Sequence, residues 1–320
     1  MGVFVLLPLV LPLTALPLAR LAEQHLHPRS AARLLTAAAV ILASCSTLCL
    51  CLLVIVGTAQ LPGNPLPDGW SDPEVRAAVP YNEVAGEAAI VVLAVVATAC
   101  ALTIRRHYRF RARAHRTLAG LPSTSEVAIL PDETPYAYAL PASRGAAARG
   151  GRIMVSTGML ASLDEDERDA LLAHEHAHLT GRHHRLLLAT QLAGCANPLL
   201  CPLRAAVGYS TERWADEEAA QATGDRRLTA RTVGKAALIS HDALPLPPFP
   251  LPSFATPGGP VPRRVAALLG PVPPARGWPP ALTPTGIAAL VAAAGTAVST
   301  LSALNAAFAL FLVLKAATPL

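Results

Sequence analysis

Uncharged apolar stretches recur along the chain and dominate its first third. They occupy residues 2–19, 34–57 and 86–104, the last with one charge at Glu87, and a fourth covers residues 286–314. A helix needs about 20 apolar residues to cross the hydrocarbon core of a bilayer. The pattern therefore predicts a mainly α, multi-pass membrane protein with about four transmembrane helices.

The first stretch has a second interpretation. It is short and holds Pro8, Pro12 and Pro17, so a cleaved signal peptide is the alternative to a span. A signal peptide starts with a basic segment, whereas no charged side chain precedes Arg20. We therefore expect a retained span.

The charges between the stretches predict their orientation. The loop after the first stretch carries Arg20, Arg29 and Arg33, whereas the loop between the second and third is acidic. Residues 105–116 contain six arginines and no acidic residue. Because basic loops stay in the cytoplasm, we expect the chain after Arg105 to start there and both termini to lie outside. A nucleic-acid arm is the alternative for 105–116, but its attachment to a span favours anionic lipid, and we expect no direct nucleic-acid binding.

Composition agrees with a membrane protein. The chain has 320 residues, 52% of them hydrophobic and 15% charged, whereas soluble domains carry roughly 25% charged residues. The six cysteines lie in apolar runs without a CxxC pair. We interpret them as small buried residues rather than as zinc ligands or disulfides.

Polarity divides the chain into four regions. Residues 1–116 hold three of the predicted spans, and residues 117–242, which carry most of the acidic residues, predict a compact domain. Residues 243–283 are rich in proline and predict an extended linker with a short helix, RRVAALL. Residues 284–320 hold the last span.

The compact domain contains an HExxH motif, formed by His174, Glu175 and His178. Positions i and i+4 share one face of a helix, so the two imidazoles can bind one zinc ion. Glu175 is turned by about 100° around the helix axis, where it can take a proton from the attacking water. A surface helix with incidental histidines is the alternative.

Local signals predict a helix around the motif. Ser162 and Glu165 have the spacing of a capping box. The acidic residues 165–167 suit the positive end of a helix dipole, and Gly181 can end the helix.

A carboxylate pair lies downstream of the motif. Glu212 and Asp216 stand at i and i+4, so they face one way. Glu212 can be the third zinc ligand, and Asp216 can accept a hydrogen bond from the other nitrogen of a ligand histidine. An acidic solvated face is the alternative, because Glu217 and Glu218 follow. The upstream HExxH motif favours the ligand interpretation.

The neighbouring histidines are expected off the zinc face. His176 lies between the two ligands on another side of the helix, with packing or support of the site as its expected role. His183 and His184 follow Gly181 and are expected at the surface.

The apolar run at residues 185–207 is long enough to suggest a further span. A span there would place His174 and Glu212 on opposite sides of the membrane. Asn197 and Pro198 also interrupt it, so we expect a helical hairpin against the domain or in the membrane interface.

Five segments within residues 135–269 resemble the integral-membrane zinc metallopeptidases of the BlaR/MecR antirepressor type, which share features with the HtpX-like and CAAX prenyl protease group. They are AYALP (137–141), IMVSTGML (153–160), AHEHAHL (173–179), NPLL (197–200) and ERWAD (212–216). The resemblance implies a small α+β, gluzincin-like metalloprotease domain. It implies one Zn²⁺ held by His174, His178 and Glu212, with Glu175 as catalytic base and Asp216 supporting a ligand.

The same resemblance implies how a substrate is held. The strand containing Ala137, Tyr138 and Ala139 is similar to the edge strand that such enzymes use to pair with the substrate backbone. The antirepressors end in a large extracellular sensor, whereas this chain stops six residues after Leu314. We therefore expect no sensor domain and no direct β-lactam sensing.

The expected function is a zinc endopeptidase of the inner membrane that cleaves a protein substrate at the cytoplasmic face. Regulatory signalling is a candidate role, and a cytoplasmic transcriptional repressor is a candidate partner beside the lipid bilayer. The alternative is a signal transducer that binds such a repressor and cuts nothing, or only itself. A pure binder needs no Glu175, so the intact motif favours the enzyme. A transporter is disfavoured because the predicted spans hold few ionisable groups.

Overall fold

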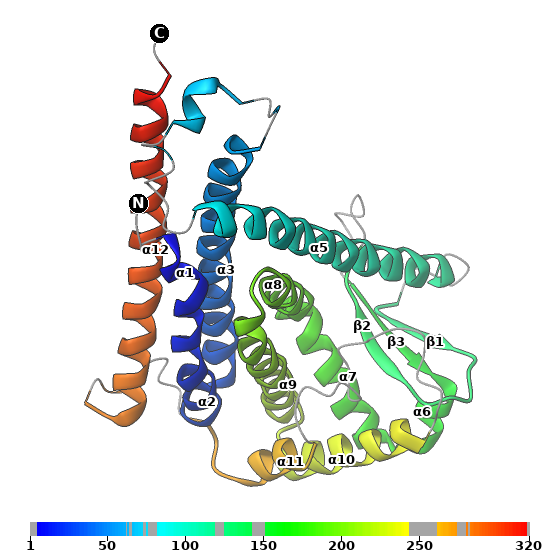
Figure 1. Cartoon of the computed structure of the whole chain (residues 1–320). Coiled ribbons are helices and arrows are strands. Elements are labelled where there is room, and N and C mark those ends of the chain that lie inside the picture. Colours follow the sequence, from blue (N-terminus) through cyan, green and yellow to red (C-terminus); the bar gives the residue numbers. More distant parts are fainter. Residues whose placement is uncertain are drawn as a thin grey trace.

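The computed structural model describes residues 5–61, 63, 66–72, 75, 82–118, 125–142, 151–242, 261–273, 280 and 282–318. Within these residues the chain is mainly helical, with one three-stranded sheet. Figure 1 shows two long helices on one side of the molecule, the sheet on the other side, and a third long helix that runs across from the first two to the sheet.

Three long helices carry the later apolar stretches. They are α3 (Pro28–Ala59), α5 (Asn82–Leu118) and α12 (Pro284–Ala316). In the described part of the chain, these three are long and apolar enough to cross a membrane. Helix α3 packs against both α5 and α12. The arginine-rich residues 105–116 continue α5 rather than leaving the helix.

The first apolar stretch is divided into α1 (Leu7–Val10), the 3₁₀ helix η2 (Leu11–Thr14) and α2 (Ala15–His25). Proline has no backbone N–H, so Pro12 leaves the Pro8 carbonyl without its helical donor. The Ser46 hydroxyl of α3 donates to that carbonyl at 2.7 Å. No single one of these short elements is a candidate span, and the fourth transmembrane helix stays a prediction.

The run at 185–207 forms the expected hairpin. Helix α8 (His183–Ala196) and α9 (Cys201–Thr223) are joined by Asn197 and the 3₁₀ helix η4 (Pro198–Leu200). Both helices pack against α3, and α8 also contacts α5. Asn197 Nδ2 donates to the Leu9 carbonyl and to the Ser46 hydroxyl, both at 3.0 Å. The Asn-Pro turn thus joins the hairpin to α1 and α3.

The sheet has the order β1-β3-β2. Strand β3 (Arg152–Ser156) pairs in parallel with β1 (Val127–Leu130) and antiparallel with β2 (Ala137–Leu140). Helix α7 (Glu165–Thr180) packs against β2 and β3, and α10 (Arg226–Asp242) packs against α7. A buried apolar cluster joins these elements; it includes Val155, Met159, Leu171, Ala236 and Leu268.

The capping box of α7 differs from the prediction by two residues. Asp164 Oδ1 accepts from the Glu167 N–H at 2.8 Å, and the Asp164 N–H donates to Glu167 Oε2 at 3.1 Å. Ser162 cannot start this helix because it ends the short helix α6 (Thr157–Ser162). Its hydroxyl donates back to the Gly158 carbonyl instead. Gly181 follows α7 as its C-cap.

The Pro-rich region is only partly described, because residues 243–260, 274–279 and 281 lie outside the described residues. Its short helix is α11 (Val261–Leu269), which packs against α9 and α10. This part of the expected linker therefore belongs to the packed body of the domain. Its Arg264 is buried.

Candidate metal centre

Helix α7 places the HExxH residues in the interior, at its contact with α9. His174, Glu175 and His178 are all buried. His174 and His178 lie one helical turn apart, and their Nε2 atoms are 3.1 Å from each other. The two imidazoles thus present the same nitrogen to one point, as two ligands of a single ion must.

Helix α9 brings Glu212 to the same point. Its Oε1 lies 3.5 Å from His178 Nε2, and its Oε2 lies 3.7 Å from His174 Nε2. One donor atom from each of the three residues lies within 4.8 Å of the others. Two imidazole nitrogens and one carboxylate oxygen form a typical donor set for catalytic zinc, in which a fourth position stays free. The residues present therefore fit a zinc ion.

Asp216 lies one turn further along α9 and faces the outer nitrogen of a histidine. Its Oδ1 is 3.1 Å from His174 Nδ1. Asp216 is itself held by Arg264 of α11, whose Nε donates to Oδ2 at 2.8 Å and whose Nη2 donates to Oδ1 at 2.6 Å. This two-pronged contact fixes the carboxylate plane and so the imidazole that it faces.

Arg264 also reaches Glu212, with Nη1 2.9 Å from Oε2. One buried guanidinium thus neutralises part of the charge of two buried carboxylates. We did not identify Arg264 from the sequence, because it follows Glu212 by more than fifty residues in a region interpreted as a linker. The one feature of the sequence that could have indicated a buried arginine is the position of Arg264 within the apolar pattern of the predicted helix RRVAALL.

These contacts determine the charge of the carboxylates. Burial alone would raise the pKa of Glu212, but Arg264, His178 and His174 outweigh it and hold that pKa well below its usual range. The same balance, dominated by Arg264, lowers the pKa of Asp216. Both groups are therefore ionised, which is the form that binds a cation or accepts an N–H.

The environment of Glu175 differs from that of Glu212 and Asp216, which both pair with Arg264. Its carboxylate is buried, and neither oxygen has a well-aligned hydrogen-bond donor among the residues that the structure describes. Burial raises the pKa of Glu175 to about 7, with His174 acting in the opposite direction and Glu212 adding to the rise. A carboxylate with a pKa near neutrality can both take up and release a proton at ordinary pH.

The strand expected to bind substrate lies at an edge of the described sheet and against α7. The Ser156 N–H donates to the Tyr136 carbonyl at 3.0 Å. Hydrogen-bonded pairs alternate along an antiparallel ladder, so Tyr138 bonds to β3 while the N–H and C=O of Ala137 and Ala139 point to the free edge. Ala137 is buried there and Ala139 is partly exposed, and the Ala139 N–H lies at the Glu175 carboxylate of α7.

The remaining histidines depart in part from expectation. His176 is half-exposed and pairs with Glu126 at 2.7 Å, so it neither packs in the core nor supports the metal centre. The prediction of a surface position for His183 is wrong: its side chain is buried, and its Nδ1 lies 2.8 Å from His178 Nδ1. His184 is partly buried, and burial lowers its pKa to about 4.

The acidic residues after Asp216 have partners elsewhere. Glu217 pairs with Arg213 at 2.9 Å and also with Arg226. Glu218 accepts from the Trp214 indole at 2.9 Å. Neither belongs to the cluster of possible metal ligands, and neither forms a purely solvated face.

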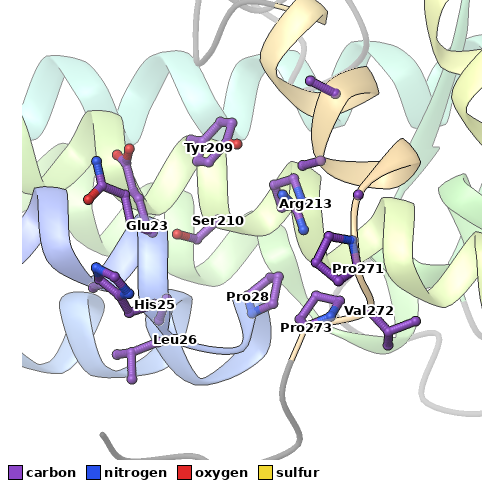
Figure 2. A pocket seen from close by; sticks show the side chains of 16 residues that line it. Glu23, His25, Leu26, Pro28, Tyr209, Ser210, Arg213, Pro271, Val272 and Pro273 are labelled. Atoms are coloured by element: carbon purple, nitrogen blue, oxygen red, sulfur yellow. The ribbon is translucent and has the colours of Figure 1, made fainter. Parts of the chain in front are cut away.

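A cavity of about 300 Å³ lies on another side of α9. It is lined by α2 and the start of α3 on one side, and by α9 and the end of α11 on the other. Figure 2 shows Tyr209, Ser210 and Arg213 of α9 around this space. The residues that line it include none of the cluster His174, His178 and Glu212, so the cavity is separate from the metal centre.

Comparisons with known proteins agree with this chemistry. Residues 102–209 match the profile of peptidase family M48. A stretch of 106 residues is 35% identical to a "Protease HtpX homolog" of Chlorobium phaeobacteroides (strain BS1), and covers 33% of this chain. The match spans about a third of that relative, 32% of its length. No solved structure matches the chain significantly.

The matches favour one of the two expected groups. They support the M48 and HtpX side of the resemblance, and they do not show the narrower BlaR/MecR affiliation. The M48 match ends at Tyr209, before Glu212, so the third ligand rests on the geometry described above. The M48 region, the HtpX relative, the long apolar helices and the buried His-His-Glu cluster together support a membrane-associated metallopeptidase of the M48 type.

Proposed function

We propose that the chain is a membrane-embedded zinc endopeptidase that cleaves a protein substrate at the cytoplasmic face of the inner membrane. The observation that carries the proposal is the buried cluster of His174, His178 and Glu212 with Glu175 on the same helix turn. A buried cluster of charge and imidazole is costly to maintain without a ligand, and this donor set is that of catalytic zinc.

A zinc ion held by the three side chains would polarise the scissile carbonyl and make water a stronger nucleophile. In this proposal Glu175 accepts the proton of the attacking water and returns it to the leaving amine. Its buried carboxylate, with a pKa raised to about 7, suits both steps. Asp216 keeps the His174 imidazole oriented, and Arg264 keeps Asp216 in place.

The free edge of β2 supplies the substrate site in this proposal. A substrate segment in extended form would add as a further strand and bond to the N–H and C=O of Ala137 and Ala139, with Tyr138 pairing to β3. The α7 helix packs against β2, so a strand bound there would run past Glu175. Recognition through the backbone suits a peptidase that accepts unfolded or extended segments.

The proposed cytoplasmic position of the zinc domain rests on the distribution of positive charge along the chain. The arginines of residues 105–116 extend α5 towards the domain, and basic segments beside spans remain in the cytoplasm. The zinc domain, residues 117–242 with α11, would then face the cytoplasm. A domain on the cytoplasmic side could cleave a cytoplasmic repressor and so act in regulation. Identification of the substrate would test this regulatory role.

The test is the Glu175→Gln variant, purified in detergent and compared with wild type on a quenched peptide. Glutamine has nearly the same shape, so the zinc content and the fold should persist, while cleavage should fall by ~10²–10⁴-fold because the proton acceptor is lost. Cleavage at the wild-type rate would reject Glu175 as base and favour a membrane signal transducer that cuts nothing through this motif. Peptides near the membrane that disappear in a Glu175→Gln strain would identify the substrate.

A further inference from the structure

The two imidazoles of the metal centre are held from behind by different residues. Their Nε2 atoms face each other and Glu212. His174 directs its Nδ1 to Asp216 at 3.1 Å. His178 directs its Nδ1 to the Nδ1 of His183, at 2.8 Å. His183 therefore occupies, for the second ligand, the place that Asp216 occupies for the first.

We propose that His183 is a positioning residue for His178, accepting a hydrogen bond from the His178 Nδ1–H. This inference rests on the proposed function, because it takes the cluster to be a zinc site. Only one of the two facing nitrogens can carry a proton in a neutral pair. A histidine that binds metal through Nε2 carries its proton on Nδ1, so His183 must present its bare Nδ1 and hold its own proton on Nε2.

The backbone between α7 and α8 is shaped to return His183 to the site. Arg182 has φ 51°, and no other non-glycine residue in the described ranges has a positive φ. Such a conformation is unfavourable for a residue with a side chain and persists where the surroundings enforce it. Gly181 lies against the His183 ring, and a Cβ at this glycine would collide with that ring. The left-handed conformation of Arg182 and the missing side chain of Gly181 thus both allow the His183 ring to lie against His178.

Side chains from two other helices hold the same ring. His183 packs edge-on against His178, with ring centroids 4.7 Å apart, and lies 4.5 Å from the Trp214 ring of α9. Arg29 and Arg33, at the start of α3, place their guanidinium groups over Trp214 at 5.4 and 5.2 Å. Elements α3, α8 and α9 therefore fix the direction in which His183 points its acceptor.

A pair of amide variants separates hydrogen bonding from packing. In His183→Asn the amide oxygen can take the place of Nδ1, whereas in His183→Gln the amide group reaches the place of Nε2 instead. His183→Leu removes the acceptor and keeps apolar bulk. His184→Leu is the matched control, since His184 is the next residue on α8 and is only partly buried, whereas His183 is buried against His178. The probe is Zn²⁺ itself, with affinity measured by competition with a chelator in detergent.

We expect His183→Leu and His183→Gln to bind Zn²⁺ ~10–100-fold more weakly than wild type, the usual effect of losing the partner of a ligand histidine. His183→Asn should recover most of the affinity, and His184→Leu should match wild type. With Co²⁺ in place of zinc, the visible absorption of His183→Gln should differ in band shape from that of wild type and His183→Asn. If His183→Leu does not fold, the Asn and Gln pair carries the test alone.

Two results would overturn the inference. One is wild-type zinc affinity in His183→Gln; the other is equal weakening in the Asn and Gln variants, which would assign His183 a packing role only. His178→Ala, measured beside them, tells this failure from failure of the metal centre. If His178→Ala loses zinc while His183→Gln keeps it, only the role of His183 is refuted; if His178→Ala keeps zinc, the proposed centre is wrong.

Discussion

Replacing Arg264 by methionine removes the cation shared by the two buried carboxylates of α9. Arg264 donates to both oxygens of Asp216 and lies 2.9 Å from Glu212 Oε2, and all three side chains are buried. Methionine keeps much of the length and apolar surface of the arginine stem. The variant therefore tests the charge contact more than the packing of α11.

The expected loss is large because the carboxylates remain buried without their partner. Removing one member of a buried ion pair costs ~3–5 kcal/mol. At about 2 °C or more per kcal/mol, the unfolding temperature should fall by at least ~6 °C when a chelator is present. Zinc bound beside Glu212 would supply positive charge of its own, so the fall should be smaller in excess zinc.

The assay is thermal unfolding in detergent at one scan rate, with chelator and with zinc. Arg263→Met is the matched control on the same helix. Arg263 is partly exposed, pairs with Glu23 at 2.7 Å and lies over the Tyr209 ring. An exposed pair contributes ~0–1 kcal/mol, so the control should change by only a few degrees.

The pH dependence of zinc binding gives a second readout of the same variant. Arg264 holds the pKa of Glu212 below its usual range against the effect of burial. Without Arg264, burial raises that pKa, so Glu212 takes up a proton at a higher pH and then no longer binds the ion. On acidification, Arg264→Met should release zinc at a higher pH than wild type. Equal unfolding temperatures for Arg264→Met and Arg263→Met, with an unchanged pH of zinc release, would refute the shared buried contact.

Three further predictions follow from the site and the topology. Glu212→Ala should reduce bound zinc well below one per chain, whereas Glu217→Gln should keep it because Glu217 pairs with arginines away from the cluster; metal analysis of the purified variants decides, and full zinc in Glu212→Ala would require another ligand. Ala139→Pro should lower kcat/KM on the quenched peptide without loss of zinc, since it removes an N–H that points away from β3, towards Glu175 and a bound substrate; unchanged kinetics would place the substrate elsewhere. Alkaline phosphatase should be inactive when fused after Gly120 and active when fused after Gly63, and the reverse pattern would put the zinc domain outside the cytoplasm.

The elements that follow from local pattern were predictable from the sequence. The period of HExxH places two imidazoles on one face, and the spacing of Glu212 and Asp216 does the same for the carboxylates. The apolar lengths predict the long helices α3, α5 and α12. The hairpin at 185–207 followed from the requirement that His174 and Glu212 share one site.

The features that depend on tertiary contact were not predictable in the same way. Arg264 reaches Glu212 only because α11 folds back onto α9, which no local period encodes. His183 enters the site because Arg182 adopts a left-handed conformation, which its residue type does not favour. The capping box lies at Asp164 rather than at the predicted Ser162, because Ser162 is the last residue of α6. Helix α6 is too short to be recognised from the hydrophobic pattern.

We propose that one zinc ion at His174, His178 and Glu212 makes this chain a peptidase. The most direct measurement is a titration of Zn²⁺ into the chelator-treated protein while cleavage of the quenched peptide is recorded. We predict no cleavage without metal, a linear rise in cleavage up to one zinc per chain, and no rise in His178→Ala. Cleavage that persists in the metal-free protein, or that zinc restores equally in His178→Ala, would contradict it.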